Sequence, residues 1–190
     1  MERVTGKRRM ALAALVAAAI MTAGPASAQT LGMGSTETQW AIGLGYGSQS
    51  YGADGSTGTA TAIQVLYRAR VLAGAGHSSW LYEFGAEYSQ SGDAPEIDDA
   101  GTESELTTVG AFYRINRLFG DRLYGGGRLG LSSVDGGDPD DDGIAVGVGV
   151  QGGFLITDRI SVGIETVLID PSSKLDGAPM ETRGTFTVGF

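Results

Sequence analysis

Apolar and polar residues alternate along most of the chain that follows its N-terminal region. Successive side chains of a strand point to opposite faces, so an alternation with a period of two predicts strands and not helices. The predicted strands cover residues 39–47, 59–71, 79–89, 105–115, 122–132, 144–156, 160–168 and 182–190. Most of them have about the 9–11 residues that a tilted strand needs to cross a bilayer.

The second face of these strands indicates what the apolar face contacts. In residues 144–156, Ile144 and Val146 share the apolar face, whereas Ala145 and Gly147 share the other face. A water-facing surface carries many charged side chains, whereas small residues suit the crowded interior of an eight-stranded barrel. We therefore predict an all-β fold, an eight-stranded antiparallel up-and-down transmembrane β-barrel. The alternative is a soluble lipocalin-like barrel, with the apolar face around a hydrophobic ligand.

The segment 105–115 has the least regular alternation. We assign Val109 and Tyr113 to its outer face, but Leu106 and Phe112 then lie on the opposite face. The parity of this strand is therefore an open question at the level of the sequence.

The connections between the predicted strands alternate in length. Long connections are residues 48–58, 90–104, 133–143 and 169–180, and short ones are 72–78, 116–121 and 157–159. Acidic side chains dominate the long connections. Long outer loops and short periplasmic turns are typical of membrane barrels, so both termini are predicted to be periplasmic.

The N-terminal region has the layout of a secretory signal peptide. Basic residues that include Lys7 and Arg8 precede an apolar stretch, residues 10–23, and the small residues Ala26 and Ala28 frame a cleavage site. We predict a cleaved signal peptide at residues 1–28 and a barrel domain at 29–190. An uncleaved helical anchor is the alternative.

The composition narrows the classes of protein further. The 190 residues include no cysteine, so the chain can form neither a disulfide framework nor a thiolate metal site. A net charge of −9 argues against binding to nucleic acid. The abundance of glycine, 32 residues against 5 prolines, favours strands whose backbones approach closely.

Aromatic residues gather near the ends of the predicted strands. The predicted girdle at the periplasmic rim consists of Trp40, Tyr67, Trp80, Tyr82, Tyr113, Phe154 and Phe190. The last strand ends with Phe186, Val188 and Phe190 on one face. This ending resembles the C-terminal strand of Gram-negative outer-membrane barrels, which the barrel-assembly machinery reads in those proteins.

The whole of residues 29–190 resembles the small outer-membrane barrels, the family of outer membrane protein X and the barrel domain of outer membrane protein A. The resemblance rests on the predicted signal peptide, the regular succession of predicted hairpins and the aromatic C-terminus. It implies a location in the outer membrane of a Gram-negative cell, in contact with lipid and lipopolysaccharide, and assembly by the barrel-assembly machinery.

Charged residues of both signs fall on the predicted inner face. They are Arg68, Glu83, Glu87, Arg114, Arg128, Glu165 and Arg183, together with the polar Gln151. Counting from the hairpin turns predicts a lower cluster, Arg68–Glu83–Arg114, and an upper cluster around Glu165. A charge in a narrow dry lumen must be paired, so we expect a satisfied polar plug. A gated ion path is the alternative.

Two further motifs have candidate chemistry. Asp138, Asp140 and Asp142 repeat as in the start of an EF-hand-type calcium loop, but Gly149 stands where that loop needs a bidentate glutamate. We therefore expect a solvated acidic loop and no cofactor, with Ca²⁺ binding as the alternative. His77 and Ser79 have the spacing found in the lipid A deacylase barrel, but they lie in a predicted periplasmic turn, so no catalytic role is assigned.

These patterns predict a structural or surface-interaction barrel with acidic extracellular loops. A narrow porin-like channel for small solutes or ions is the alternative. We expect no enzymatic activity; with one histidine and no cysteine, the chain offers no other nucleophile–base arrangement.

Overall fold

The computed structural model describes residues 36–51, 56–71, 79–92, 107–135, 143–171 and 180–190. Its strands are β1 (Thr36–Tyr51), β2 (Ser56–Val71), β3 (Trp80–Gly92), β4 (Thr107–Phe119), β5 (Leu123–Asp135), β6 (Gly143–Leu155), β7 (Ile160–Pro171) and β8 (Met180–Gly189). No helix in this part of the chain is long and apolar enough to cross a membrane. The predicted signal peptide, residues 1–28, lies outside the described residues.

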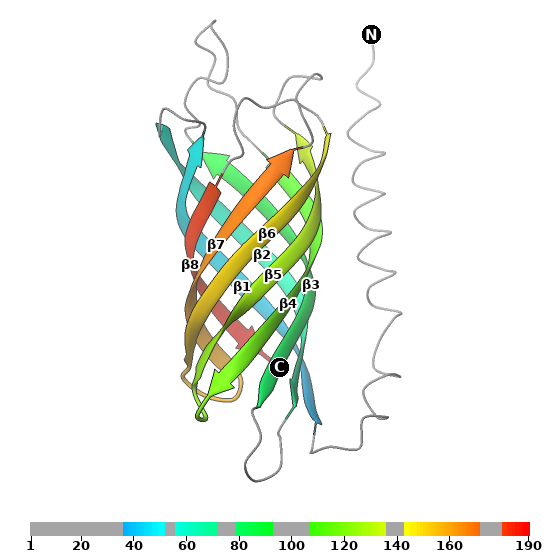
Figure 1. Ribbon diagram of the computed structural model, residues 1–190, viewed down its shortest axis with the longest axis vertical. Helices are drawn as coiled ribbons and strands as arrows, with labels where there is room; N and C mark the ends of the chain where they lie inside the picture. The colour runs from blue at the N-terminus through cyan, green and yellow to red at the C-terminus, as the bar shows by residue number, and fades with distance from the viewer. Residues whose placement is uncertain (1–35, 52–55, 72–78, 93–106, 136–142, 172–179) are drawn as a thin grey trace, which may run out of the picture.

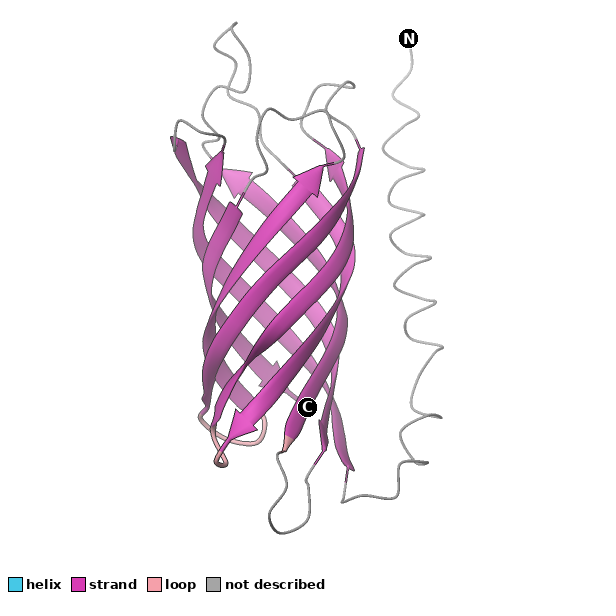
Figure 2. Cartoon of the chain, viewed as in Figure 1, coloured by secondary structure: helices cyan, strands magenta, loops and turns pink. Residues whose placement is uncertain are grey.

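The eight strands form a closed barrel in which each strand pairs with its neighbours in the sequence. All pairings are antiparallel, and β8 closes the barrel against β1, with Leu44 opposite Phe186. Figures 1 and 2 show the strands tilted against the long axis of the barrel. Closure leaves no unpaired sheet edge, which is the condition for placing strands in lipid.

The two ends of the barrel can be told apart by the described turns. One end of the barrel has the short turns at residues 120–122 and 156–159 and the C-terminal Phe190. We call it the lower end, as it is oriented in Figure 1. Gly120 has a φ of 66°, a left-handed conformation that glycine adopts without steric cost. The upper end is the opposite one, where β1 ends and β2 begins.

The apolar face of the strands points outward, as the alternation predicts. Exposed side chains include Leu44, Ile63 and Leu131, with 54, 55 and 60 % of their surface accessible. In β4, Phe112 is buried and Tyr113 is exposed. The predicted parity of that strand is therefore confirmed, and the soluble barrel with an inward apolar face is excluded.

The predicted length is wrong for the first strand, residues 39–47, and too short for the second, residues 59–71, because both extend well beyond the span of a bilayer. Both β1 and β2 have 16 residues, and their pairing continues to Tyr51 and Ser56. The connection between them is therefore residues 52–55, not 48–58, and it is shorter than the connection at 72–79 between β2 and β3. The predicted alternation of long and short connections thus fails at the first hairpin.

Candidate functional site

The interior of the barrel contains a set of charged side chains, each at most 9 % exposed. The set consists of four arginines and four glutamates, namely Arg68, Arg114, Arg128, Arg183, Glu83, Glu87, Glu165 and Glu181. Their formal charges cancel. We call this set the lumen network.

The lower part of the network is centred on Glu83. The Nε and Nη2 atoms of Arg68 donate to the Oε1 atom of Glu83 at 2.9 and 2.7 Å. Arg114 approaches the other oxygen, with its Nη1 atom 3.4 Å from Oε2. Arg68 and Glu83 lie opposite each other on β2 and β3, which is the register that hairpin counting predicts.

Arg114 also connects this lower part to the rest of the network. Its Nε and Nη2 atoms donate to the two carboxylate oxygens of Glu165, each at 2.9 Å. Such a two-pronged contact is the strongest geometry available to an arginine and a carboxylate. Because Arg114 is on β4 and Glu165 on β7, the contact crosses the lumen between strands that are not neighbours.

Glu165 is the centre of the upper part, and it has no accessible surface. Besides Arg114, its carboxylate accepts from Arg128 Nη1 at 3.0 Å and from Arg183 Nη2 at 2.9 Å. Arg128 and Arg183 in turn both contact Glu87. Three arginines therefore share one carboxylate, and two of them also share a second.

Three further side chains complete the upper part: the acceptor Glu181 and the donors Ser89 and Gln64. Arg183 Nη1 lies 3.0 Å from Oε2 of Glu181, and Ser89 donates to the same carboxyl group at 3.1 Å. The side-chain amide of Gln64 donates to Glu87 at 2.6 Å. Glu181 was absent from the predicted set, although it lies two residues before Arg183 and so shares its inward face.

The buried aromatic ring of Phe112 lies against two arginines of the network. Its ring centroid is 4.3 Å from the guanidinium carbon of Arg114 and 4.6 Å from that of Arg128. Contacts of this kind between a cation and an aromatic face are attractive and gain strength when water is excluded. The ring of Phe112 thus stabilises both guanidinium groups.

The structure corrects the predicted grouping of these residues. Two separate clusters were expected, but Arg114 joins them into one continuous network. Gln151 was assigned to the upper cluster because it pairs with Glu165 in the β6–β7 register. Its amide instead donates to Asn116 on β4 at 2.7 Å. Arg183 lies directly opposite Glu165, not diagonal to it as predicted.

Apolar clusters fill the lumen on both sides of the network. Leu81, Leu118, Tyr124 and Leu155 pack together toward the lower end. Val134, Ala145, Val167 and Ile169 pack together toward the upper end. In an eight-stranded barrel the interior is just wide enough for side chains, so the arrangement is a packed interior with a charged middle.

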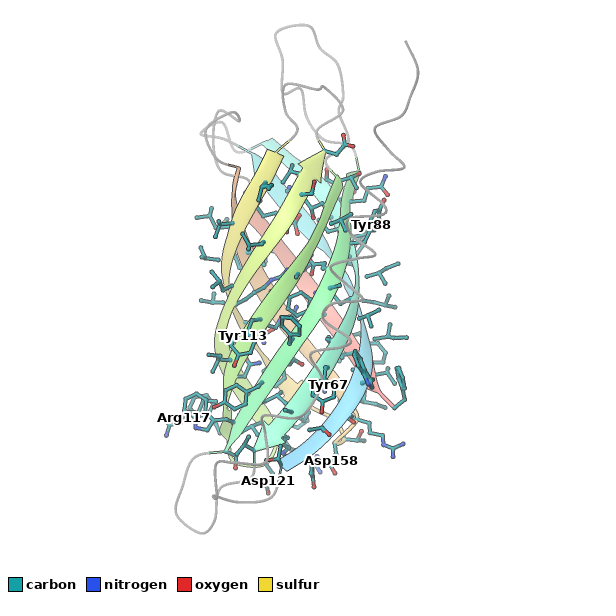
Figure 3. The ribbon with its side chains drawn as sticks, turned by 90° about the vertical axis from the view of Figure 1, so that its right-hand side faces the viewer. Tyr67, Tyr88, Tyr113, Arg117, Asp121 and Asp158 are labelled. Atoms are coloured by element: carbon teal, nitrogen blue, oxygen red, sulfur yellow. The ribbon has the colours of Figure 1, made fainter. Side chains whose placement is uncertain are left out.

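The predicted girdle residues lie on the outer wall. The rings of Trp40 and Tyr67 meet edge to face at 5.3 Å, and those of Trp80 and Tyr82 are stacked at 6.4 Å. Figure 3 shows Tyr67 toward the lower end, Tyr88 toward the upper end and Tyr113 between them. Phe119, which is not among the predicted girdle residues, is 54 % exposed at the end of β4, beside the turn at residues 120–122.

The apolar residues at the C-terminus lie on the outer side of the barrel. Phe186, Val188 and Phe190 are all exposed, as their alternation predicts. The backbone nitrogen of Phe190 donates to the carbonyl of Trp40 at 2.9 Å, which joins the end of the chain to the wall of the barrel.

Two of the candidate motifs lie outside the described residues. These are the acidic repeat of Asp138, Asp140 and Asp142, and the segment that contains His77. Within the part of the chain that the structure describes, no group of three or more acidic or histidine side chains is arranged to hold a metal ion.

A closed barrel with an apolar outer wall and a charged interior is a transmembrane β-barrel. The sequence matches the family model of the outer membrane protein beta-barrel domain over residues 12–190. The chain belongs to this family and is located in the outer membrane, in contact with membrane lipid.

Two solved structures are similar to this chain. Neisserial surface protein A aligns with a TM-score of 0.47 and 16 % identity, over 82 % of this chain and 99 % of its own. An outer membrane channel from Pseudomonas putida F1 aligns with a TM-score of 0.34 and 11 % identity, over 88 % of this chain and 99 % of its own. The sequence has no match among curated proteins.

Proposed function

We propose that this outer-membrane protein has a structural or surface-interaction role and that its lumen does not conduct ions. The observation that carries the proposal is the continuity of the lumen network, in which Glu165 and Arg183 are almost without accessible surface. An ion on its way through the barrel would have to displace these paired side chains.

The energy of such a displacement supports a closed lumen. Removing one partner of a buried ion pair costs about 3–5 kcal/mol. A state that costs this much is populated about once in a hundred to several thousand molecules, since about 1.4 kcal/mol corresponds to a factor of ten. Because Arg128 contacts two carboxylates and Arg183 contacts three, opening requires the separation of several pairs at once.

We further propose that the lower end faces the periplasm. The C-terminal strand ends there, where Phe186, Val188 and Phe190 would be available to the barrel-assembly machinery. The acidic connections between the strands would then lie outside the cell. Their carboxylates suit contacts with lipopolysaccharide through divalent cations, and Asp138, Asp140 and Asp142 would contribute to such contacts.

Single-channel recording in planar bilayers tests the proposal. The purified protein, whose folding is checked by the shift of its gel mobility on boiling, is expected to give no steady conductance. The double variant Glu165→Ala/Arg183→Ala removes one charge of each sign and two side chains, so it is expected to give small conducting events.

The matched control is Val148→Ala, which shortens an outward side chain of β6 and leaves the lumen unchanged. It is expected to be as silent as the unmodified protein. Steady conductance of the unmodified protein, altered by Glu165→Gln alone, would contradict the proposal and favour the narrow porin-like channel.

A further inference from the structure

Apolar and cationic side chains lie together on the outer wall at the lower end of the barrel. Phe119 of β4 is opposite Leu123 of β5, which in turn is opposite Phe154 of β6. All three are exposed, so they form one apolar row across three strands. The guanidinium carbon of Arg117 is 5.6 Å from the ring centroid of Phe119, and that of Arg122 is 5.9 Å from the ring centroid of Phe154. We call these five residues the rim patch.

Both arginines of the rim patch are exposed at the surface. Figure 3 shows Arg117 on the side of the barrel, whereas Asp158 lies at its lower end. In this they differ from Arg68 and Arg70, which pair with carboxylates in the lumen and at its mouth. The guanidinium groups of the rim patch are therefore open to molecules outside the barrel.

The rim patch lies at the level of the aromatic girdle. Arg117 is directly opposite Trp80 of β3, and Trp80 stacks on Tyr82. Tryptophan and tyrosine gather where the membrane meets water, and arginine side chains near this level extend their charge toward the lipid headgroups. The arginines thus lie within reach of lipid phosphates, and the apolar row lies beside the acyl chains.

Glycines border the apolar row on the side of the membrane interior. Gly125 of β5 and Gly152 of β6 are opposite each other, and each lies two residues from a member of the row, so they share its outer face. A Cβ atom added at Gly125 would lie 3.7 Å from the Phe119 ring. Since neither glycine has a side chain, there is room for an acyl chain next to the row.

The charges around the rim patch suit a lipid with a single negative charge. Arg117 and Arg122 contribute two positive charges, and Asp121 in the same turn contributes one negative charge. Asp158 in the next turn is paired with Arg70. One positive charge therefore remains, which matches one phosphodiester. The lipid A part of lipopolysaccharide has more than one phosphate and needs more cations.

We propose that the rim patch binds an anionic phospholipid of the phosphatidylglycerol type. Arg117 and Arg122 donate to the phosphate oxygens, for which arginine is well suited, and an acyl chain lies against Leu123. The phosphate and the rings then contact the two guanidinium groups together. This binding does not depend on whether the lumen conducts or on which end of the barrel faces the periplasm.

Fluorescence quenching in vesicles tests the proposal. The Trp40→Phe variant leaves Trp80, next to the rim patch, as the only tryptophan. The folded protein is placed in phosphatidylcholine vesicles with a rising fraction of phosphatidylglycerol whose acyl chains are brominated and quench tryptophan on contact. Phosphatidylglycerol is expected to bind about fivefold more tightly than brominated phosphatidylcholine.

Arg122→Gln in the same background is expected to remove at least half of this preference, and Arg117→Gln/Arg122→Gln to remove it. The matched control is Arg159→Gln, which also takes one exposed cation from a turn at the lower end, but at the mouth of the barrel. It is expected to leave the preference unchanged. The gel-mobility shift on boiling checks that each variant is folded.

Three results would overturn the proposal. Equal quenching by the two brominated lipids would mean that the wall does not select anionic lipid. Equal losses in Arg122→Gln and Arg159→Gln would mean that the attraction comes from the overall charge of the lower end. Displacement of the brominated phosphatidylglycerol by lipid A at a lower fraction than by unbrominated phosphatidylglycerol would mean that the patch selects lipopolysaccharide. The first and third results do not depend on the folding of the arginine variants.

Discussion

The outer and inner faces of the same strands differ in how strictly they limit the side chains that fit there. In β6, the outward Val146, Val148 and Val150 are 46–66 % exposed, whereas the inward Ala145 has no accessible surface. The outer face needs only apolar side chains of any shape, because lipid adapts to them. The inner face needs both a fitting shape and a partner for every charge, because nothing else in the lumen can supply one.

Glycine shows the difference between the faces most directly. A Cβ atom added to the inward Gly85 would lie 2.5 Å from the carbonyl oxygen of Val65 and 2.9 Å from a ring carbon of Phe112. A Cβ atom added to the outward Gly127 would meet no heavy atom closer than 3.7 Å. Close approach therefore requires glycine at the inward position 85, but not at the outward position 127.

The largest expected effect is the loss of a central charge of the lumen network. Glu165→Gln leaves three arginines without a full countercharge, so we expect the free energy of unfolding to fall by about 3–5 kcal/mol. Urea unfolding in lipid vesicles, followed by the fluorescence of Trp40 and Trp80, measures this change.

The matched control for this variant is Asp158→Asn. Asp158 also pairs with an arginine, but its side chain is 82 % exposed. A loss of at most about 1 kcal/mol is expected for such a surface pair. Equal losses in the two variants would contradict the contrast between a buried and an exposed pair.

A charge placed on the outer face has the next largest expected effect. Val148→Arg puts a cation at the middle of β6, where lipid surrounds it, and we expect a loss of about 2–4 kcal/mol. Ile144→Arg, near the upper end of the same strand, is expected to cost at most about 1 kcal/mol. The same unfolding assay compares them, and a loss that does not depend on depth would place the apolar belt elsewhere.

Alanine substitutions at Gly85 and Gly127 are expected to change the free energy of unfolding less than the added charges do, and in different directions. Gly85→Ala forces Phe112 or the β2 backbone to move, so we expect a loss of about 1–3 kcal/mol in the free energy of unfolding. Gly127→Ala is expected to be neutral or to stabilise the protein by up to about 1 kcal/mol, since alanine restricts the unfolded chain. Destabilisation of similar size at both positions would remove the distinction.

The smallest effect is expected for the aromatic ring in the network. Phe112→Leu removes the contact with Arg114 and Arg128, and we expect a loss of about 1–2 kcal/mol. Phe119, whose ring lies 5.6 Å from the guanidinium carbon of Arg117 on the outer wall, is the control. Phe119→Leu is expected to cost less than half as much, and a larger loss there would argue that the lumen does not strengthen such contacts.

Local sequence patterns predict the face of each strand and many of its neighbours. Alternation correctly places Leu44, Tyr113 and Phe186 outside, and hairpin counting correctly places Arg68 opposite Glu83. The prediction ends the first hairpin too early because the pairs Gln49–Gly58 and Ser50–Thr57 near its upper end consist of polar residues and glycine, which continue no apolar face. The pattern of hydrophobic positions therefore cannot predict the strand ends in this part of the hairpin.

Contacts across the lumen could not be predicted in this way. Counting from turns relates only strands that are adjacent in the sheet, whereas Arg114 meets Glu165 across the barrel from β4 to β7. The same holds for Gln151 and Asn116 on β6 and β4. Which strands face each other depends on the tilt and closure of the barrel, and these are properties of the whole sheet.

The most direct test of the account is a double-mutant cycle between Glu83→Gln and Arg183→Gln, measured as the free energy of unfolding. Glu83 and Arg183 lie in the two parts of the network, which Arg114 and Glu165 connect. Losing one charge of each sign restores the balance, so the double variant is expected to be more stable than the sum of the single losses by more than about 0.5 kcal/mol. Additive losses, within about 0.3–0.5 kcal/mol, would mean two independent clusters and would contradict a single lumen network.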